Sequence, residues 1–294
     1  MINIALKELK KYQGHVWTEL PTKKVGKHDL IILKDWSAEK LLHIARRQSA
    51  QVAILSDSAL PLELAPFVDW IFPLNTDLTL LQPLTGQLDE QQQQQQQRPS
   101  IRALFLDRDG VVNVDHGYVG KPSQVQLMPK IGELIARVSH HKLKTIIVTN
   151  QSGIGRGYYT EDDFHNVMKC IGGLLEEDQA HIDQVQFSSY HPSSSQEQYL
   201  FGRQFRKPRP GMFHCADGDI DLTNSILVGD RATDLKAGVL AGVGQIYLYT
   251  SEQSENEWLE FQSWIESLTL RQGLGNLLDG ISVKIISSLN EVKI

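Results

Sequence analysis

The stretch Leu104-Phe105-Leu106-Asp107-Arg108-Asp109-Gly110 decides the fold, because an apolar run ends abruptly in two carboxylates and a glycine. A continuous apolar run predicts a strand that is buried on both faces. Similar runs recur later in the chain, at 145–148, 185–187, 226–228 and 246–248. Apolar residues with helical spacing at 131–138 and 160–175 lie between them. This alternation predicts an α/β fold with a doubly wound parallel sheet.

Reactive side chains follow these strands. Ligands of such sheets bind beyond the carboxyl ends of the strands. Four clusters lie at strand ends or in a loop, at 107–110, 149–153, 206–208 and 229–234. A single Asp-x-Asp pair is typical of a solvated loop, but four clusters in this order indicate a catalytic site.

The residue types in these clusters fit phosphoryl transfer. Asp107 can attack phosphorus and form an aspartyl-phosphate. Asp109 can protonate the leaving oxygen and later activate water. The attacked phosphate is an anion, so the site must also supply positive charge and hydrogen-bond donors. The Thr149 hydroxyl and the Lys207 ammonium group are the candidates for this task.

A metal ion is the second expected source of positive charge. Magnesium prefers hard oxygen ligands, which Asp107 and Asp230 offer as carboxylates and Asp109 as a backbone carbonyl. Asp234 is expected to position Lys207 or a water molecule around the ion. The sequence therefore predicts a magnesium-dependent phosphatase with Asp107 as its nucleophile.

These clusters resemble the haloacid dehalogenase superfamily of phosphatases, on 107–111, Thr149, Lys207 and 229–234. Longer strings resemble the heptose bisphosphate phosphatase family, at 106–119, 148–157 and 206–212. That family removes the 7-phosphate of D-glycero-D-manno-heptose 1,7-bisphosphate, a step toward lipopolysaccharide. The resemblance covers residues 101–250 and implies a capless fold, in which loops rather than a lid domain shape the pocket.

The same resemblance assigns further contacts. It implies that Asn150 joins Thr149 and Lys207 in binding phosphate. Asn113, Gln151, Ser152 and Arg206 are expected to face the sugar or its phosphate. An arginine can bind a phosphate with two parallel hydrogen bonds, which a lysine cannot do.

One departure from the family concerns a structural zinc loop. Family members carry Cys-x-His and then Cys-x-Cys before the Arg-Lys-Pro string. The corresponding residues here are Ser188, Tyr190, Arg203 and Phe205, which cannot reproduce a thiolate–imidazole site. We expect no structural zinc, and the loop must be held by other contacts.

A run of seven glutamines at 91–97 marks a domain boundary. We predict a small α/β region at 1–88, a linker at 89–100 and the phosphatase domain at 101–294. In the first region, strands are expected at 30–33, 52–55 and 70–72, and a helix after Ser37. Its role stays open between a protein-interaction module, a regulatory module and an extra sheet packed on the core.

The end of the chain carries two weaker signals. Apolar residues between Trp258 and Leu268 predict an amphipathic helix, and 283–286 predicts an edge strand.

Composition limits the class of protein. The net charge of −6 and the pI of about 5.9 argue against a nucleic-acid binder. We expect no membrane-spanning segment and no secretory signal, because the apolar runs are short and the first residues soon become charged. We expect a cytoplasmic enzyme with a phosphorylated sugar substrate. The alternatives are a histidinol-phosphate phosphatase, another sugar or nucleotide phosphatase, and an inactive binding module.

Overall fold

The structure is a computed structural model that describes two compact units. The described residues are 101–194, 196, 199, 203–216, 220–250, 254–272 and 278–294, with the strands 16–17, 30–33, 51–55 and 70–72. One unit comprises Met1–Pro99 with Ser267–Gly275, and the other Ser100–Glu266 with Asn276–Ile294. The glutamine run, the predicted linker and the helix expected after Ser37 lie outside the described residues. The predicted domain boundaries stay a prediction.

The first unit contains a small parallel sheet. Its strands are β1 (Val16–Trp17), β2 (Leu30–Leu33), β3 (Gln51–Leu55) and β4 (Trp70–Phe72), paired in chain order. The expected strands are confirmed to within one residue. Strand β1 was not predicted, because two residues are too few to show a pattern.

The second unit is built on a six-stranded sheet with the order β10-β9-β8-β5-β6-β7. All neighbouring strands are parallel. The strands are β5 (Ala103–Leu106), β6 (Lys144–Asn150), β7 (Gln184–Ser188), β8 (Ile226–Gly229), β9 (Gln245–Tyr249) and β10 (Ser282–Ile286). The predicted parallel sheet is confirmed, including β10 as an edge strand.

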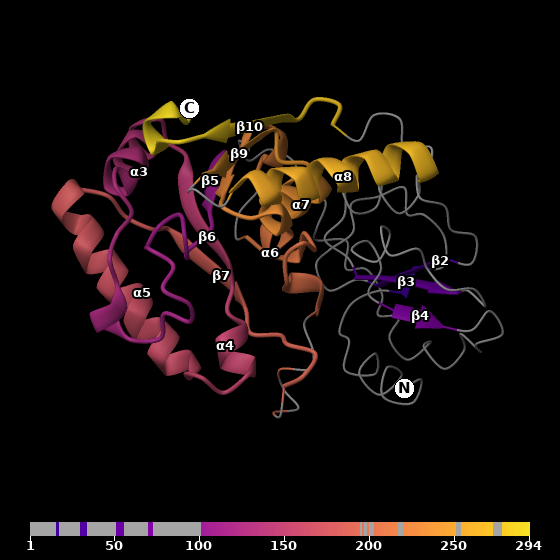
Figure 1. The fold of residues 1–294 in the computed structure, drawn as a ribbon, viewed down its shortest axis with the longest axis horizontal. Helices are drawn as coiled ribbons and strands as arrows, with labels where there is room; N and C mark the ends of the chain where they lie inside the picture. Colours follow the sequence, from indigo (N-terminus) through magenta and orange to yellow (C-terminus); the bar gives the residue numbers. More distant parts are fainter. Residues whose placement is uncertain are drawn as a thin grey trace, which may run out of the picture. The chain divides into compact units, whose positions relative to one another are not determined.

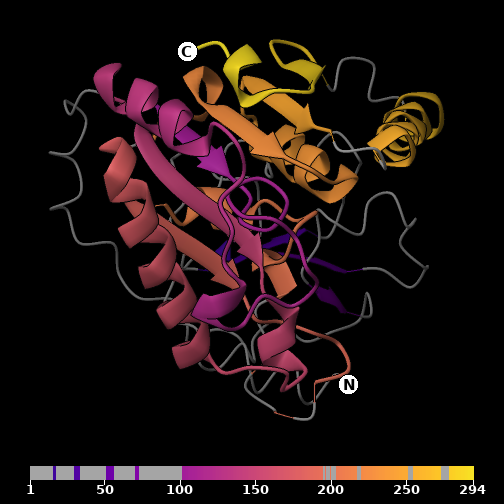
Figure 2. The ribbon, with the colours of Figure 1, turned by 60° about the vertical axis from the view of Figure 1, so that its left-hand side comes forward.

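Helices cover both faces of this sheet. They are α3 (Ile131–His140), α4 (Ser152–Gly155), α5 (Glu161–Leu175), α6 (Gly211–His214), α7 (Ala232–Ala241) and α8 (Ser254–Gln272). The short 3-10 helices are η4 (Pro122–Gln124), η5 (Glu176–Asp178), η7 (Arg203–Phe205), η8 (Leu222–Asn224) and η9 (Leu289–Glu291). Figure 1 shows α3 and α5 on one side of β5–β7 and α6 and α7 on the other, and Figure 2 shows the same arrangement after rotation.

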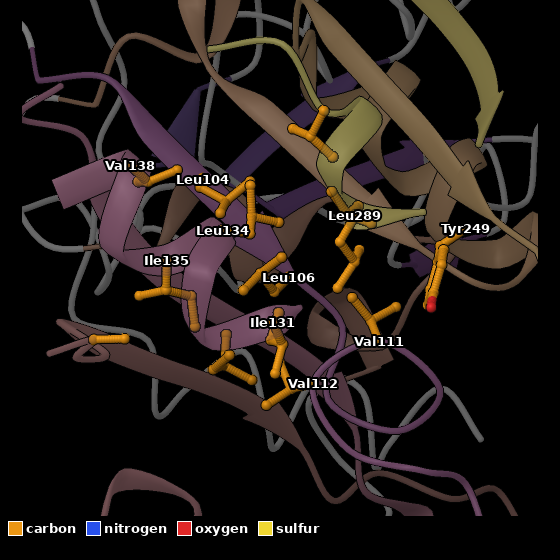
Figure 3. Close-up of a cluster of buried hydrophobic side chains, with 14 of the residues drawn as sticks. Leu104, Leu106, Val111, Val112, Ile131, Leu134, Ile135, Val138, Tyr249 and Leu289 are labelled. Atoms are coloured by element: carbon orange, nitrogen blue, oxygen red, sulfur yellow. The ribbon is translucent and has the colours of Figure 1, made fainter. Parts of the chain in front are cut away.

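The alternation of side chains along β5 explains why the sheet needs two helical layers. Leu104 and Leu106 belong to a fully buried cluster with Leu134 of α3 (Figure 3). Phe105 points to the opposite face, where its ring centroid lies 4.9 Å from that of Phe213 in α6. Because successive strand residues face opposite sides, both layers are apolar interiors. The doubly wound prediction is therefore confirmed.

Two connections at the carboxyl ends of the strands contain little secondary structure. Between β5 and α3 the chain forms a loop with only η4, and between β6 and α5 it forms only α4. No domain is inserted in these two connections, in agreement with a capless fold. Among the residues that the structure describes, no helix is long and apolar enough to span a membrane.

Candidate active site

The site lies where the chain order of the sheet reverses. Strand β5 pairs with β6 on one side and with β8 on the other, and Leu106 lies opposite both Ile147 and Val228. The carboxyl ends of these three strands therefore meet. Asp107 follows β5 directly, Thr149 and Asn150 end β6, and Asp230 follows β8. Such a reversal is where ligands bind in open α/β sheets.

Lys207 is held between two buried carboxylates. Its Nζ lies 3.0 Å from Asp107 Oδ1 and 2.5 Å from Asp234 Oδ1, and it donates to the Val148 carbonyl at 2.8 Å. Burial alone would lower the pKa of Lys207, but the two carboxylates outweigh it and raise the pKa to about 12. Lys207 is therefore a fixed positive charge at neutral pH. Asp234 contacts the lysine that it was predicted to position.

A third carboxylate completes the group. Oxygen atoms of Asp107, Asp230 and Asp234 lie within 4.8 Å of one another, the one such group of potential metal ligands among the described residues. Burial, followed by the charges of Asp107 and Asp234, raises the pKa of Asp230 to about 8. Burial also raises the pKa of Asp107. The Oδ1 atom of Asp230 is buried and has no hydrogen-bond donor. Clustered carboxylates with an unpaired buried oxygen fit a divalent cation.

Gly110 allows the approach of Asp230. Its φ of +84° lies in the left-handed region, and a β-carbon at this position would overlap the Asp230 carboxylate. Its N–H donates to the Asn113 carbonyl at 2.7 Å, which closes the turn after Asp109. Glycine is thus required here by both backbone conformation and space.

Arg108, the residue between the two aspartates, is fully buried and orients Asp109. Its Nη2 donates to both Asp109 oxygens at 2.8 and 2.9 Å and to the Val119 carbonyl at 3.1 Å. The guanidinium carbon also lies 5.5 Å from the centre of the Phe164 ring. This role of Arg108 was not predicted from the sequence. The one signal was a charged residue directly after a buried strand.

Gln151 links Asp109 to Thr149. Its amide nitrogen donates to Asp109 Oδ2 at 3.0 Å and to Thr149 Oγ1 at 2.8 Å. Its amide oxygen accepts a hydrogen bond from the Tyr159 hydroxyl at 2.5 Å. Burial raises the pKa of Tyr159 to about 12, so this hydroxyl stays a donor. Because Thr149 Oγ1 already accepts a bond, its hydrogen is left for a ligand.

Two asparagines that were predicted to contact the ligand form hydrogen bonds with protein groups in the structure. Asn150 accepts from the Lys207 N–H at 2.9 Å and donates to the Lys207 carbonyl at 3.1 Å, which fixes the lysine backbone. Asn113 is fully buried and donates to Asp109 Oδ1 at 3.1 Å. The predicted sugar contacts of Asn113 and Gln151 stay predictions. The structure places both amides on Asp109.

Arg206 lies in a second positive cluster beside this site. Its Nη1 is buried and has no partner. Burial and the charge of Arg156 lower the pKa of Arg206. Arg156 contacts the Tyr118 hydroxyl at 2.9 Å and His191 Nε2 at 2.7 Å. Ser152, the remaining predicted substrate residue, begins α4 and is half-buried. Two guanidinium groups close together fit an anionic group.

Of the four positions that carry zinc ligands in the resembled family, Ser188 ends β7, Tyr190 lies in the loop after β7, and Arg203 and Phe205 lie in η7. Ser188 is buried, and its Oγ has no partner. Nearby, the His191 N–H donates to the Tyr199 carbonyl at 3.1 Å. The expectation of no structural zinc stays a prediction.

Comparison with known proteins adds to this geometry. A family model described as HAD-hydrolase-like matches residues 204–267. The chain is 46% identical over 149 residues to the D-glycero-alpha-D-manno-heptose-1,7-bisphosphate 7-phosphatase of Burkholderia mallei, covering 50% of this chain and 79% of the relative. It is 36% identical over 146 residues to the beta-anomer enzyme of Photorhabdus laumondii, covering 49% and 78%.

A solved structure agrees with these relatives. The D,D-heptose 1,7-bisphosphate phosphatase of B. bronchiseptica, complexed with magnesium and phosphate, superimposes with a TM-score of 0.51 at 25% identity. The match covers 64% of this chain and 94% of that protein.

Proposed function

The chain belongs to the heptose-1,7-bisphosphate 7-phosphatase family of the haloacid dehalogenase superfamily, and we propose that it hydrolyses the 7-phosphate of D-glycero-D-manno-heptose 1,7-bisphosphate. Lys207 between Asp107 and Asp234, with Asp230 beside them, is the observation that carries this proposal. An inactive binding module would not need this costly arrangement of buried charges.

In the first chemical step, Asp107 is the nucleophile. The polar contacts of its carboxylate with Lys207 Nζ and with the Arg108 N–H both use Oδ1, which leaves Oδ2 for attack. A new bond forms between this oxygen and phosphorus while the bond between phosphorus and O7 of the sugar breaks. Asp109 gives its proton to O7, so that the sugar leaves as a neutral alcohol. Thr149 and Lys207 supply a donor and a positive charge to the phosphoryl oxygens.

The second step releases phosphate. Asp109, now a carboxylate, takes a proton from a water molecule that attacks phosphorus. The bond between phosphorus and Asp107 breaks, which restores the free aspartate and yields inorganic phosphate. Arg108, Asn113 and Gln151 contribute by fixing the orientation of the Asp109 carboxylate.

Magnesium is the proposed cofactor. Asp107 and Asp230 would hold it through carboxylates and Asp109 through its backbone carbonyl. The unpaired Asp230 Oδ1 supports this assignment. When bound, the ion neutralises charge on the transferring phosphoryl group. Asp234 serves by holding Lys207.

The second phosphate of the substrate is assigned to Arg206. The half-buried Arg206, whose Nη1 atom is buried and unpaired and which lies next to Arg156, suits a ligand that carries two separate phosphates. This feature favours a sugar bisphosphate over histidinol phosphate or a nucleoside monophosphate. The names of the relatives point the same way, and they include both anomers.

The proposal is tested by comparing kcat/KM for the two heptose bisphosphate anomers, histidinol phosphate and nucleoside monophosphates, in magnesium buffer. We expect a heptose bisphosphate to be the best substrate by at least an order of magnitude. The variant Arg206→Lys should raise KM for the bisphosphate about tenfold, because the bidentate contact is lost, and leave kcat/KM for a monophosphate nearly unchanged. A better rate with histidinol phosphate would refute the substrate assignment and leave the phosphatase chemistry standing.

A further inference from the structure

The junction between β8 and α7 carries two of the three clustered carboxylates. Asp230 follows the last residue of β8, and Asp234 lies in the first turn of α7. The side chain of Arg231, the residue before α7, makes no capping hydrogen bond. One donor of this turn is satisfied internally, because the Arg231 N–H donates to Asp234 Oδ2 at 3.0 Å. The position of this turn therefore determines the positions of the Asp230 and Asp234 carboxylates.

A residue from a distant helix completes the turn. The carboxylate of Glu257, in α8, accepts a hydrogen bond from the Ala232 N–H at 2.6 Å. Ala232 is fully buried and is the first residue of α7, whose N–H has no acceptor within the helix. A carboxylate at this place also interacts favourably with the helix dipole. Asp234 cannot take over the task without giving up Lys207 or the Arg231 N–H, because its two oxygens serve these groups.

The rest of α8 is anchored independently of Glu257. Phe261 and Trp264 are buried along the helix. One turn after Glu257, Glu260 pairs with Lys236 of α7, also at 2.6 Å. Figure 1 shows α8 running beside α7. A change at Glu257 should therefore leave the helix in place, and Glu260 provides a matched contact that does not touch the β8–α7 junction.

We propose that Glu257 is a positioning residue that holds the β8–α7 junction, and thereby Asp230 and Asp234, in the arrangement that binds magnesium. The inference rests on the proposed function for the identity of the ion. Loss of an outer contact of a metal site commonly costs ten- to a hundredfold in affinity, and we expect about tenfold here because Glu257 acts through the backbone.

The test uses the full chain and the variants Glu257→Ala, Glu257→Gln and, as the control, Glu260→Gln. Calorimetric titration with magnesium chloride measures the Kd. We expect the Kd to rise about tenfold in Glu257→Ala, less in Glu257→Gln, which keeps an acceptor, and less than twofold in the control. An unchanged Kd in Glu257→Ala overturns the proposal. If that variant does not fold, Glu257→Gln decides, and a Kd equal to that of the control overturns it.

Amide hydrogen exchange of the metal-free protein gives a readout that needs no ion. We expect the amides of residues 232–235 to exchange at least severalfold faster in Glu257→Ala than in wild type, with the control unchanged. If wild type itself binds no magnesium, the proposed metal site is wrong, and this exchange result alone decides whether Glu257 holds the junction. Equal exchange in wild type and Glu257→Ala overturns that role.

Discussion

Asp230 should make the metal-free protein less stable as the pH rises. Burial and the charges of Asp107 and Asp234 raise its pKa from 3.8 to about 8. Between these values the folded protein keeps a proton that the unfolded chain has released. The folded state thus binds more protons, and the free energy of unfolding falls with increasing pH. The stabilising contribution of the Asp230 proton is fully present below the ordinary pKa of 3.8 in the unfolded chain. It is lost as the pH rises toward the folded-state pKa of about 8.

The size of the effect follows from one proton. A difference of one bound proton changes the free energy of unfolding by about 1.4 kcal/mol per pH unit. From pH 5 to pH 7 the loss is about 3 kcal/mol, which lowers the unfolding midpoint of a domain of this size by about 5–10 °C. In Asp230→Asn a neutral amide replaces the titrating group. We expect its midpoint to change much less over this range and to exceed that of wild type at pH 7.

The assay is thermal unfolding of the full chain in EDTA at pH 5, 6 and 7, followed by near-ultraviolet circular dichroism. Magnesium provides the second half of the test. The ion must displace the Asp230 proton, so its stabilising effect should grow from pH 6 to pH 8 in wild type and be absent in Asp230→Asn. Parallel curves for wild type and variant between pH 5 and pH 7 would refute the reasoning.

Further predictions concern the chemistry, the zinc loop and the boundary. Asp107→Asn should fold but lower kcat by several orders of magnitude, and chelating magnesium should act similarly; a mutant with most of its activity would end the assignment. Arg108→Met should lower kcat about ten- to a hundredfold with little change in KM, because Asp109 loses its orientation, and an unchanged kcat contradicts this role. Elemental analysis should find no stoichiometric zinc, whereas about one zinc per chain would mean that the 188–205 loop is misassigned. A fragment that starts at Pro99 should be soluble and keep magnesium-dependent activity; a soluble but inactive fragment would show that residues before it complete the site.

Apolar runs explain how much of the fold was predictable. The strands β5, β6, β8 and β9 were predictable because a strand buried between two helical layers needs a continuous apolar segment. The helix α5 was marked by its apolar spacing and by Thr160, whose hydroxyl accepts from the Asp163 N–H at 3.1 Å. The helices α4 and α6 were not predicted, because four residues are one turn and show no periodicity.

The candidate site was predictable where side chains act at strand ends. Asp107 and Asp230 come together because parallel strands bring their carboxyl ends to one edge, and the chain that follows brings Lys207 and Asp234 to the same place. Sequence position does not state which way a side chain points. Gln151 turns toward Asp109 because its amide oxygen accepts a hydrogen bond from Tyr159 and its amide nitrogen donates to Thr149, and these contacts exist only in the folded chain.

Contacts between residues far apart in the sequence could not be predicted, for the same reason. Arg108 is buried because Val119 and Phe164 surround it, and neither lies next to it in the chain. Glu257 contacts Ala232 from 25 residues away. No local pattern distinguishes such a glutamate from the exposed acids around it.

The charge balance of the carboxylate cluster has a consequence for the order in which ligands bind. Above about pH 8, where Asp230 is ionised together with Asp107 and Asp234, the single ammonium group of Lys207 leaves two negative charges in excess. A phosphate dianion entering this field would be repelled, and a divalent cation removes the excess. The two ligands should therefore bind with positive cooperativity. Reciprocity then requires that phosphate tighten magnesium binding by the same factor by which magnesium tightens phosphate. Product inhibition by phosphate should accordingly be strongest in saturating magnesium and fade as the ion is withdrawn.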